Sequence, residues 1–298
     1  MKKYIYTVIL MAVSMMMISS CSEDSLDKES IITIDKNQQV TDFDRWLKEN
    51  FVDPYNVEFK YRYEDKESDM DYYEIPAEYN QAVVMAHLLK YLCLEAYDEV
   101  GGVQFTRAYF PKLVCLSGEF KYNANNTMEL GSAEGGKKIT LTGVNYVNMF
   151  STMPDALNNY YFATIHHEFT HILNQTKDMP VEFKEITGSA YLGDQWNDAS
   201  YSEDYLQRGF ITAYAQKEYK EDFAEVMSQY VIWSDDTWNG FLTRAGVGAP
   251  IILQKLALVK AYMKDSYNID LDELRHVILR READVAAGKI DLSDLSIE

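Results

Sequence analysis

The hydrophobic period changes along the chain, and the order of these changes predicts the fold class. Residues 55–64 alternate apolar and polar side chains, which is typical of a half-buried strand. Two more strands are expected over 111–122 and 137–144. A helical period over 77–97 predicts a long helix. A shorter helix is expected to begin after Thr41 and to end at a break over 51–54.

The second half of the chain has a helical period over most of its length. We predict one helix over 154–174 and two more within 250–287. Residues 176–206 contain Pro, Gly and Asn-Asp turns and many aromatic side chains, which predicts a long loop, either shaping a binding groove or exposed on the surface. Strands followed by helices, without βαβ alternation, predict an α+β fold with a helical C-terminal half.

The predicted helix 154–174 contains His167-Glu168-Phe169-Thr170-His171, which has the pattern HExxH. Positions i and i+4 of a helix lie above one another, so the two imidazoles can bind one Zn²⁺ from the same side. Glu168 lies about 100° around the helix. From there its carboxylate can reach a zinc-bound water as a general base without being a ligand, as a zinc hydrolase requires.

Catalytic zinc normally takes a third ligand from the protein. The metzincin continuation HExxHxxGxxH is excluded, because the chain has Asn174 and Lys177 where it needs Gly and His. A second helix, expected from Tyr219, carries Glu221 and Glu225 one turn apart, and two stacked carboxylates repel unless a cation or an imidazole N–H lies between them. Glu221 would then bind zinc and Glu225 would accept the free N–H of a zinc-binding histidine. A solvated acidic face is the alternative.

Two resemblances bear on this choice. The segment EDFAE (221–225), with Tyr214 seven residues before it, resembles the third-ligand helix of the lethal-factor-type zinc toxins, which are gluzincin-like peptidases. Most of the chain resembles the zinc-binding metallopeptidase lipoproteins found beside bacterial outer-membrane nutrient-uptake systems, through its N-terminal Cys motif, HHEFTH, the approach from Gly209 to Tyr214, and EDFAE.

The resemblance implies a zincin-like fold, a small sheet with an HExxH helix, and a site with three zinc ligands, one general base and one proton donor. In this sequence the zinc ligands would be His167, His171 and Glu221. The general base would be Glu168 and the proton donor Tyr214. The Tyr214 phenol would donate its proton to the oxyanion of the tetrahedral intermediate. Asp222 is the rival ligand, Tyr219 is a rival phenol that the helix turns away, and His166 is expected to lie beside the ligands or partly exposed.

The first residues have the composition of a secretory signal, with a basic start, an apolar run over 5–18 and then Ser19-Ser20-Cys21. We predict a signal peptide over 1–20, a lipidated tether over 21–38 with lipid on Cys21, and a metallopeptidase domain over 39–298. The alternative is a plain signal with an incidental cysteine. The acidic residues after Cys21 resemble a tag for the outer face of the outer membrane, which favours a surface-facing outer-membrane lipoprotein over a periplasm-facing one.

The net charge limits the classes of binding partner, and the two remaining cysteines raise the question of a disulfide. A net charge of −19 repels phosphate backbones, so no nucleic-acid partner is expected, and membrane attachment would come through the lipid. Cys93 and Cys115 are expected as separate buried thiols, with a disulfide as the alternative.

The sequence therefore predicts a zinc-dependent, lipid-anchored extracytoplasmic peptidase that acts on a protein or peptide, and the resemblance implies association with an outer-membrane uptake system. The strand over 139–144 is expected to be the sheet edge that aligns the substrate. The alternatives are a non-catalytic surface-binding or accessory lipoprotein that retains the zinc scaffold, and a zinc hydrolase acting on a non-peptide amide.

Overall fold

A computed structural model of the chain describes residues 39–64, 74–122, 128–129, 131–134, 137–198, 200–201 and 204–297. All its helices and strands lie in one compact unit, Thr41–Glu298. The predicted signal peptide over 1–20 and tether over 21–38, with Cys21, lie outside the described residues.

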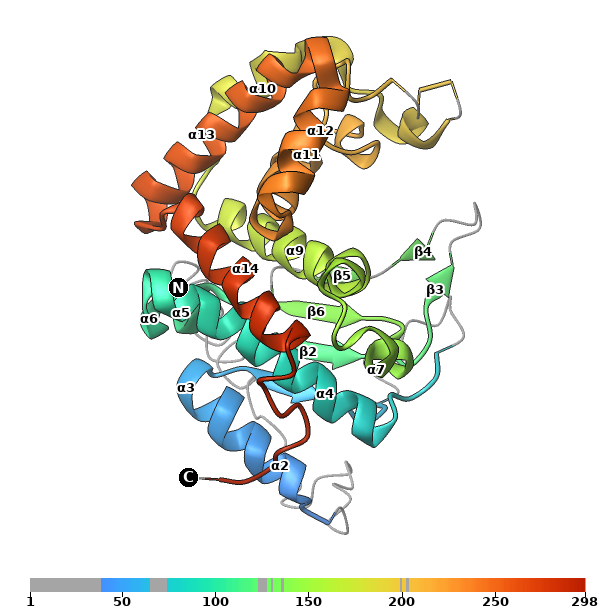
Figure 1. Cartoon of the computed structure of the whole chain (residues 1–298), viewed down its shortest axis with the longest axis vertical. Helices are drawn as coiled ribbons and strands as arrows, with labels where there is room; N and C mark the ends of the chain where they lie inside the picture. Colours follow the sequence, from blue (N-terminus) through green and yellow to red (C-terminus); the bar gives the residue numbers. More distant parts are fainter. Residues whose placement is uncertain are drawn as a thin grey trace, which may run out of the picture. The chain divides into compact units, whose positions relative to one another are not determined.

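Helices make up most of the unit (Figure 1). In chain order, the α-helices are α2 (Asp42–Leu47), α3 (Asp53–Tyr55), α4 (Tyr79–Leu89), α5 (Glu95–Gly101), α6 (Val103–Tyr109), α7 (Val147–Phe150), α8 (Pro154–Leu157), α9 (Ala163–Thr176), α10 (Val181–Thr187), α11 (Tyr219–Ile232), α12 (Asp235–Ala245), α13 (Ala249–Tyr267) and α14 (Leu271–Ala286). Wider π-helical turns join several of them: η1 (Lys48–Val52), η3 (Lys90–Leu94) and η5 (Asn158–Phe162). Short 3₁₀ turns are η4 (Val144–Tyr146), η6 (Gly188–Ala190), η7 (Gly193–Asn197), η8 (Tyr214–Gln216) and η9 (Gly246–Gly248).

The sheet is small and mixed. Its strand order is β1 (Glu58–Lys60), β2 (Leu113–Leu116), β6 (Lys138–Leu141) and β5 (Gly131–Glu134). The first three are parallel and β5 is antiparallel to β6, while β3 (Lys121–Tyr122) and β4 (Met128–Glu129) form a separate ribbon. The predicted α+β class is confirmed. The expectation that the strand over 139–144 is an edge is wrong, because β6 is paired on both sides and the edge strands are β1 and β5.

The first helical stretch is longer than its sequence pattern predicts. Thr41 and Asp44 form a capping box at its start, in which the Asp44 carboxylate accepts the Thr41 N–H at 2.7 Å. The helix then runs through η1 and α3 to Asn56, whose left-handed backbone ends it. The predicted break at 51–54 is wrong, because Pro54 falls in the first turn of α3, a position that tolerates proline.

The predicted helix 154–174 is α8, η5 and α9 in succession. Its apolar stripe, Ile165, Phe169 and Ile172, is buried, and the Phe169 ring meets the Tyr97 ring edge-on at 5.0 Å. This stripe fixes α9 in the core, and its opposite face packs along α11. The two histidines of HExxH therefore face a second helix.

Residues 176–206 are not a continuous loop. Within them α10 packs the buried Phe183 ring against Phe223 of α11 at 4.9 Å, a contact between segments far apart in the chain. Cys93 and Cys115 are both buried as thiols, the expected arrangement.

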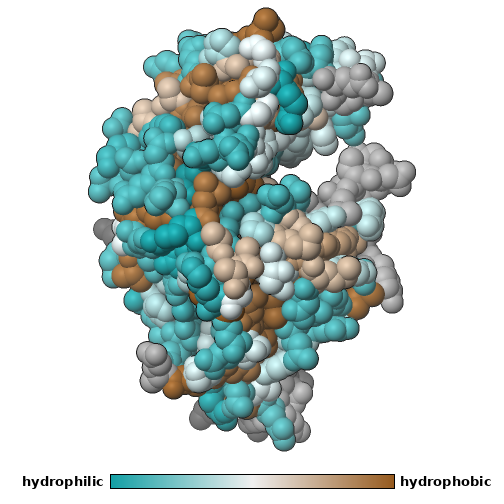
Figure 2. Space-filling model, viewed as in Figure 1, coloured by the Kyte–Doolittle hydropathy of each residue, from teal (hydrophilic) through white to brown (hydrophobic). Residues whose placement is uncertain are grey.

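The surface of the unit is largely hydrophilic on the face that Figure 2 shows, in keeping with the charge. Of the described residues, one stretch, Asp235–Tyr267, is long and apolar enough to cross a membrane by length and composition alone. Gly246 divides it with φ +51°, and α13 buries Ile252, Val259 and Met263 in the core. The stretch is therefore divided between two helices, α12 and α13, that differ in their packing.

Candidate metal centre

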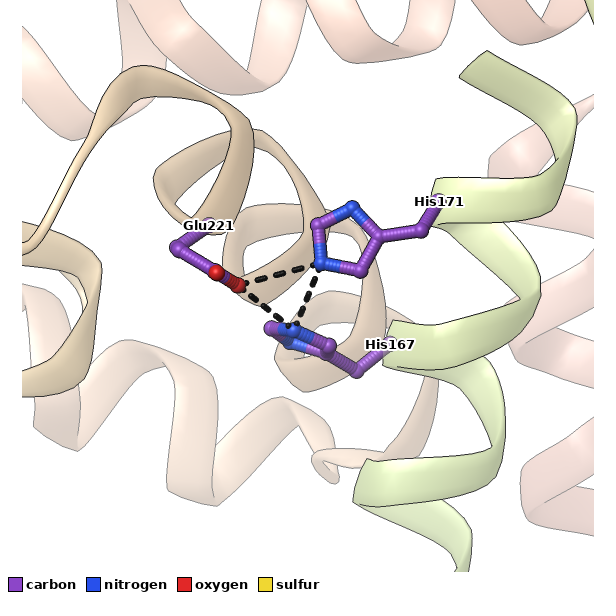
Figure 3. A group of neighbouring side chains, drawn as sticks. All are labelled: His167, His171 and Glu221. Atoms are coloured by element: carbon purple, nitrogen blue, oxygen red, sulfur yellow. Dashed lines mark hydrogen bonds and ion pairs between the residues drawn. The ribbon is translucent and has the colours of Figure 1, made fainter. Parts of the chain in front are cut away.

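Three side chains from two helices converge at one point (Figure 3). His167 and His171 come from α9 and Glu221 from the first turn of α11. Nε2 of His167 lies 3.0 Å from Nε2 of His171, and Oε2 of Glu221 lies 3.1 Å and 3.0 Å from these two nitrogens. All three donor atoms thus point inward to a common centre.

The donor set fits a zinc ion. Imidazole nitrogen and carboxylate oxygen are both zinc ligands, and donor atoms around a tetrahedral zinc with bonds of about 2.1 Å lie roughly 3.4 Å apart. The observed separations of 3.0–3.1 Å need to widen by only about 0.3–0.4 Å to reach that spacing. Two Nε2 atoms that face each other beside a carboxylate also require a cation or a proton between them.

A second carboxylate orients His167 from behind. Oε1 of Glu225 lies 2.7 Å from Nδ1 of His167, and Oε2 of Glu225 accepts a hydrogen bond of 2.7 Å from the hydroxyl of Thr212. Glu221 and Glu225 are one turn apart on α11, so each acid faces a different nitrogen of the same imidazole. This arrangement sets the ring orientation and leaves Nε2 for a metal.

The pKa values show how strongly this centre attracts positive charge. Burial alone lowers the pKa of His167, but the carboxylates of Glu221 and Glu225 outweigh it and raise the pKa to about 10. Burial raises the pKa of Glu221, but hydrogen bonds from His167 and His171 hold it well below its usual range. A proton therefore competes with a metal for His167, so metal affinity must decrease as the pH is lowered.

Tyr214 lies beside the three donors. Its ring centroid is 5.9 Å from that of His167, and Trp196 meets its ring edge-on at 5.0 Å. Nζ of Lys217 donates to the phenol oxygen at 3.3 Å and lies 3.6 Å from Oε1 of Glu221. Burial and then the Glu221 carboxylate raise the pKa of Tyr214 well above its usual value, so the phenol keeps its proton.

The sequence did not single out Lys217, Thr212 or Trp196 as residues of this centre. Lys217 stands four residues before Glu221, a spacing that favours side-chain contact near a helix start. Thr212 and Trp196 reach the centre only through the path of the chain before α11, which no local pattern indicates.

The remaining residues of the two motifs fall in different places. Glu168 is partly exposed on α9. Its charge adds to the larger effect of Glu221 in raising the pKa of both His167 and Tyr214; burial opposes this rise at His167 and reinforces it at Tyr214. Asp222 is fully buried in an ion pair with Lys255 and is not one of the three converging side chains. The Tyr219 ring makes a cation–π contact with Lys184, whose Nζ lies 4.9 Å from the ring centroid.

His166 is completely buried, and its Nδ1 lies 3.1 Å from the hydroxyl of Tyr97. Burial lowers its pKa to about 3, so the ring is neutral. The expectation that His166 is partly exposed is therefore wrong. Its imidazole faces the core with the apolar stripe of α9, away from the metal centre.

An HExxH helix facing a second helix with a carboxylate ligand defines a zincin-like metal centre. Residues 36–272 match the family described as "Putative zinc-binding metallo-peptidase", and the chain belongs to this family. The chain is also similar to a solved structure described as a putative zinc-binding metallo-peptidase from Bacteroides caccae, with 40% sequence identity and a TM-score of 0.74 over 90% of this chain and 100% of that one. A search of curated proteins gave no match. The expected zinc-binding metallopeptidase family is confirmed, and the expected Zn²⁺ agrees with its description. The lipoprotein character, the place beside an uptake system and the likeness to lethal-factor-type toxins stay predictions.

Proposed function

We propose that the chain is a zinc-dependent peptidase whose metal is held by His167, His171 and Glu221. The observation that carries the proposal is the convergence of three zinc-type donor atoms, 3.0–3.1 Å apart, on an HExxH helix and its partner. Membership of a family described as zinc-binding metallopeptidases supports the metal and the reaction class.

Each residue of the centre has a distinct task in peptide hydrolysis. Bound there, zinc supplies a Lewis acid that acidifies water and polarises the scissile carbonyl. The Glu168 carboxylate takes the proton of the attacking water and later delivers it to the leaving amine. The Tyr214 phenol, which keeps its proton, donates a hydrogen bond to the developing oxyanion. Lys217 holds the phenol oxygen from the other side.

The substrate would lie along β5. This strand is one of the two edge strands of the four-stranded sheet, and it packs near α9. An extended peptide that pairs with β5 would extend the sheet by one strand and bring its backbone past the HExxH helix. The side of β5 that β6 does not occupy offers the main-chain groups for this pairing.

The location is a second part of the proposal. The basic start, apolar run and Ser19-Ser20-Cys21 support export and lipid attachment at Cys21. The acidic residues after Cys21 favour the cell surface, and the family resemblance implies a place near an outer-membrane uptake system. A Cys21→Ser variant should then move from the membrane to the soluble fraction after cell lysis and separation. Retention of the variant in the outer membrane would contradict lipid anchoring.

Incubation of the purified mature chain with a diverse peptide library tests the reaction. The zinc-loaded wild type should cleave, and the Glu168→Gln variant should keep about one zinc per chain while its cleavage falls by at least about a thousandfold. An exposed acid on α14, outside the cleft and the metal centre, supplies the matched control: Glu273→Gln should cleave like the wild type. Equal cleavage by Glu168→Gln would contradict the assigned base.

Zinc binding with no cleavage of any peptide would favour the alternative, an accessory lipoprotein that keeps the zinc scaffold for binding. Cleavage of simple amides but not of peptides would favour the non-peptide amidase.

A further inference from the structure

A cleft of about 620 Å³ opens directly beside the metal centre. Its walls come from three segments: His171, Asn174 and Gln175 of α9, residues 178–181 with Lys184, and Tyr219 with Lys220 in the first turn of α11. His171 belongs to both the cleft and the metal centre, and Tyr219 is only two residues before Glu221. A substrate whose scissile bond lies at the metal centre must therefore place an adjoining group in or over this cleft.

The charge of the cleft differs from that of the protein as a whole. Lys184 and Lys220 both line it in a chain of net charge −19, and both are exposed. Neither lysine forms an ion pair with any acid among the described residues. Nζ of Lys184 lies 4.9 Å from the centroid of the Tyr219 ring, which places one ammonium group on the α11 wall.

Among the described residues that line the cleft, Asp178 is the one acid. The preceding carbonyl, of Lys177, accepts a hydrogen bond of 2.7 Å from the Tyr262 hydroxyl of α13. The two lysines thus leave a net positive charge in the cleft.

Uncharged groups complete the lining. Asn174 lines the cleft, and its amide oxygen and nitrogen are buried without a hydrogen-bond partner among the described residues. Met179 and Val181 supply apolar surface, and the Val181 side chain is 74% exposed. Such a lining suits a group with an aliphatic stem and a charged end.

We propose that this cleft binds a carboxylate of the substrate next to the scissile bond and that Lys184 and Lys220 select it. The carboxylate comes either from a glutamate side chain or from the C-terminus of the peptide. The inference rests on the proposed peptidase function, of which it specifies the substrate class.

A binding experiment tests the inference without turnover. The zinc-loaded Glu168→Gln variant is titrated by calorimetry with a blocked hexapeptide that contains one glutamate, its glutamine counterpart, and a glutamine peptide with a free C-terminal carboxylate. The two exposed lysines should favour a carboxylate peptide by about 3- to 10-fold at low salt, and the preference should shrink at 0.5 M NaCl. A preference for the first peptide identifies the side chain, and a preference for the third identifies the C-terminus.

Variants that change the charge of Lys184 and Lys220 test whether the preference for a carboxylate peptide arises in the cleft. In the Glu168→Gln background, Lys184→Gln with Lys220→Gln should reduce the ratio to about one, and Lys184→Glu with Lys220→Glu should reverse it. The matched control is Lys48→Gln with Lys289→Gln, two exposed lysines that do not line the cleft, and it should keep the ratio. Equal binding of the three peptides, or a preference that the cleft variants retain, would overturn the inference.

The outcomes also separate the two proposals. Preferential carboxylate binding that depends on Lys184 and Lys220, with no cleavage by the wild type, would uphold the cleft and reject the peptidase. Cleavage by the wild type without any acidic or C-terminal preference would uphold the peptidase and reject the cleft.

Discussion

Removal of the buried lysine Lys255 tests how the third-ligand helix is held. Nζ of Lys255 lies 2.6 Å from Oδ2 of Asp222 and donates to the carbonyl of Gly209 at 2.8 Å, and both charged side chains are 0% exposed. Lys255→Met would leave the Asp222 carboxylate buried, and among the described residues its side-chain partner would then be the Tyr191 hydroxyl, at 2.8 Å. Breaking a buried pair in this way costs about 3–5 kcal/mol of stability.

Urea denaturation of the metal-free protein in the presence of a chelator measures this cost, because zinc would add its own binding energy to the folded state. The variants are Lys255→Met, Asp222→Asn and the double variant. Asp222→Asn keeps an acceptor for Tyr191 but leaves the ammonium group unpaired. The double variant should cost at least about 2 kcal/mol less than the sum of the two single variants.

Two results would refute this reasoning. A loss of less than about 1 kcal/mol in Lys255→Met would show that the pair does not hold α11 and α13 together. Strict additivity of the two single variants would show that the two charges do not stabilise each other.

Three further predictions follow from single contacts. Glu225→Gln should weaken zinc binding by about 10- to 100-fold in a competition assay with a chromophoric chelator, because Glu225 orients His167; an unchanged affinity would contradict that role. Tyr214→Phe should lower kcat by about 10²- to 10³-fold with unchanged zinc content, and a normal kcat would exclude Tyr214 as the oxyanion donor. Burial raises the pKa of Glu282 from 4.5 to about 7 against the opposing hydrogen bond from Asn158, so the folded state holds a proton that the unfolded chain loses. Stability should therefore fall by up to about 3 kcal/mol as pH rises from 4.5 to 7, and denaturation at pH 5 and pH 8 should show a smaller fall in Glu282→Gln.

Local geometry explains which parts of the site the sequence could anticipate. The meeting of His167 and His171 follows from a spacing of four on a helix with an apolar opposite face. The placement of Glu225 behind His167 follows from the cost of two stacked carboxylates on α11. Each of these two predictions uses only the spacing of residues within a single helix.

The choice between Glu221 and Asp222 needs a contact that no local pattern reveals. Both acids lie in the first turn of α11, and Asp222 turns away because Lys255 of α13 neutralises it in the core. A buried lysine in a helix has the same sequence signature as an exposed one. The order of the strands is hidden in the same way, since pairing on both sides of β6 depends on β5, whose four residues give a weak strand signal.

The structure also differs from the prediction at 51–54 and 176–206, and both differences depend on the surrounding structure. A proline usually ends a helix, but Pro54 lies in the first turn of α3, within a continuous helical stretch. α10 forms because Phe183 finds a buried place against Phe223, and turn-forming residues on either side obscure it in the sequence.

The central claim is that one zinc ion, bound between α9 and α11, makes this chain a peptidase. Its most direct test is to strip the metal from the wild type with a chelator, return zinc in steps, and follow hydrolysis of a cleaved peptide at each step. We predict no hydrolysis by the stripped protein and a linear rise that ends at about one zinc per chain. Hydrolysis without zinc, or one bound zinc without hydrolysis, would contradict the account.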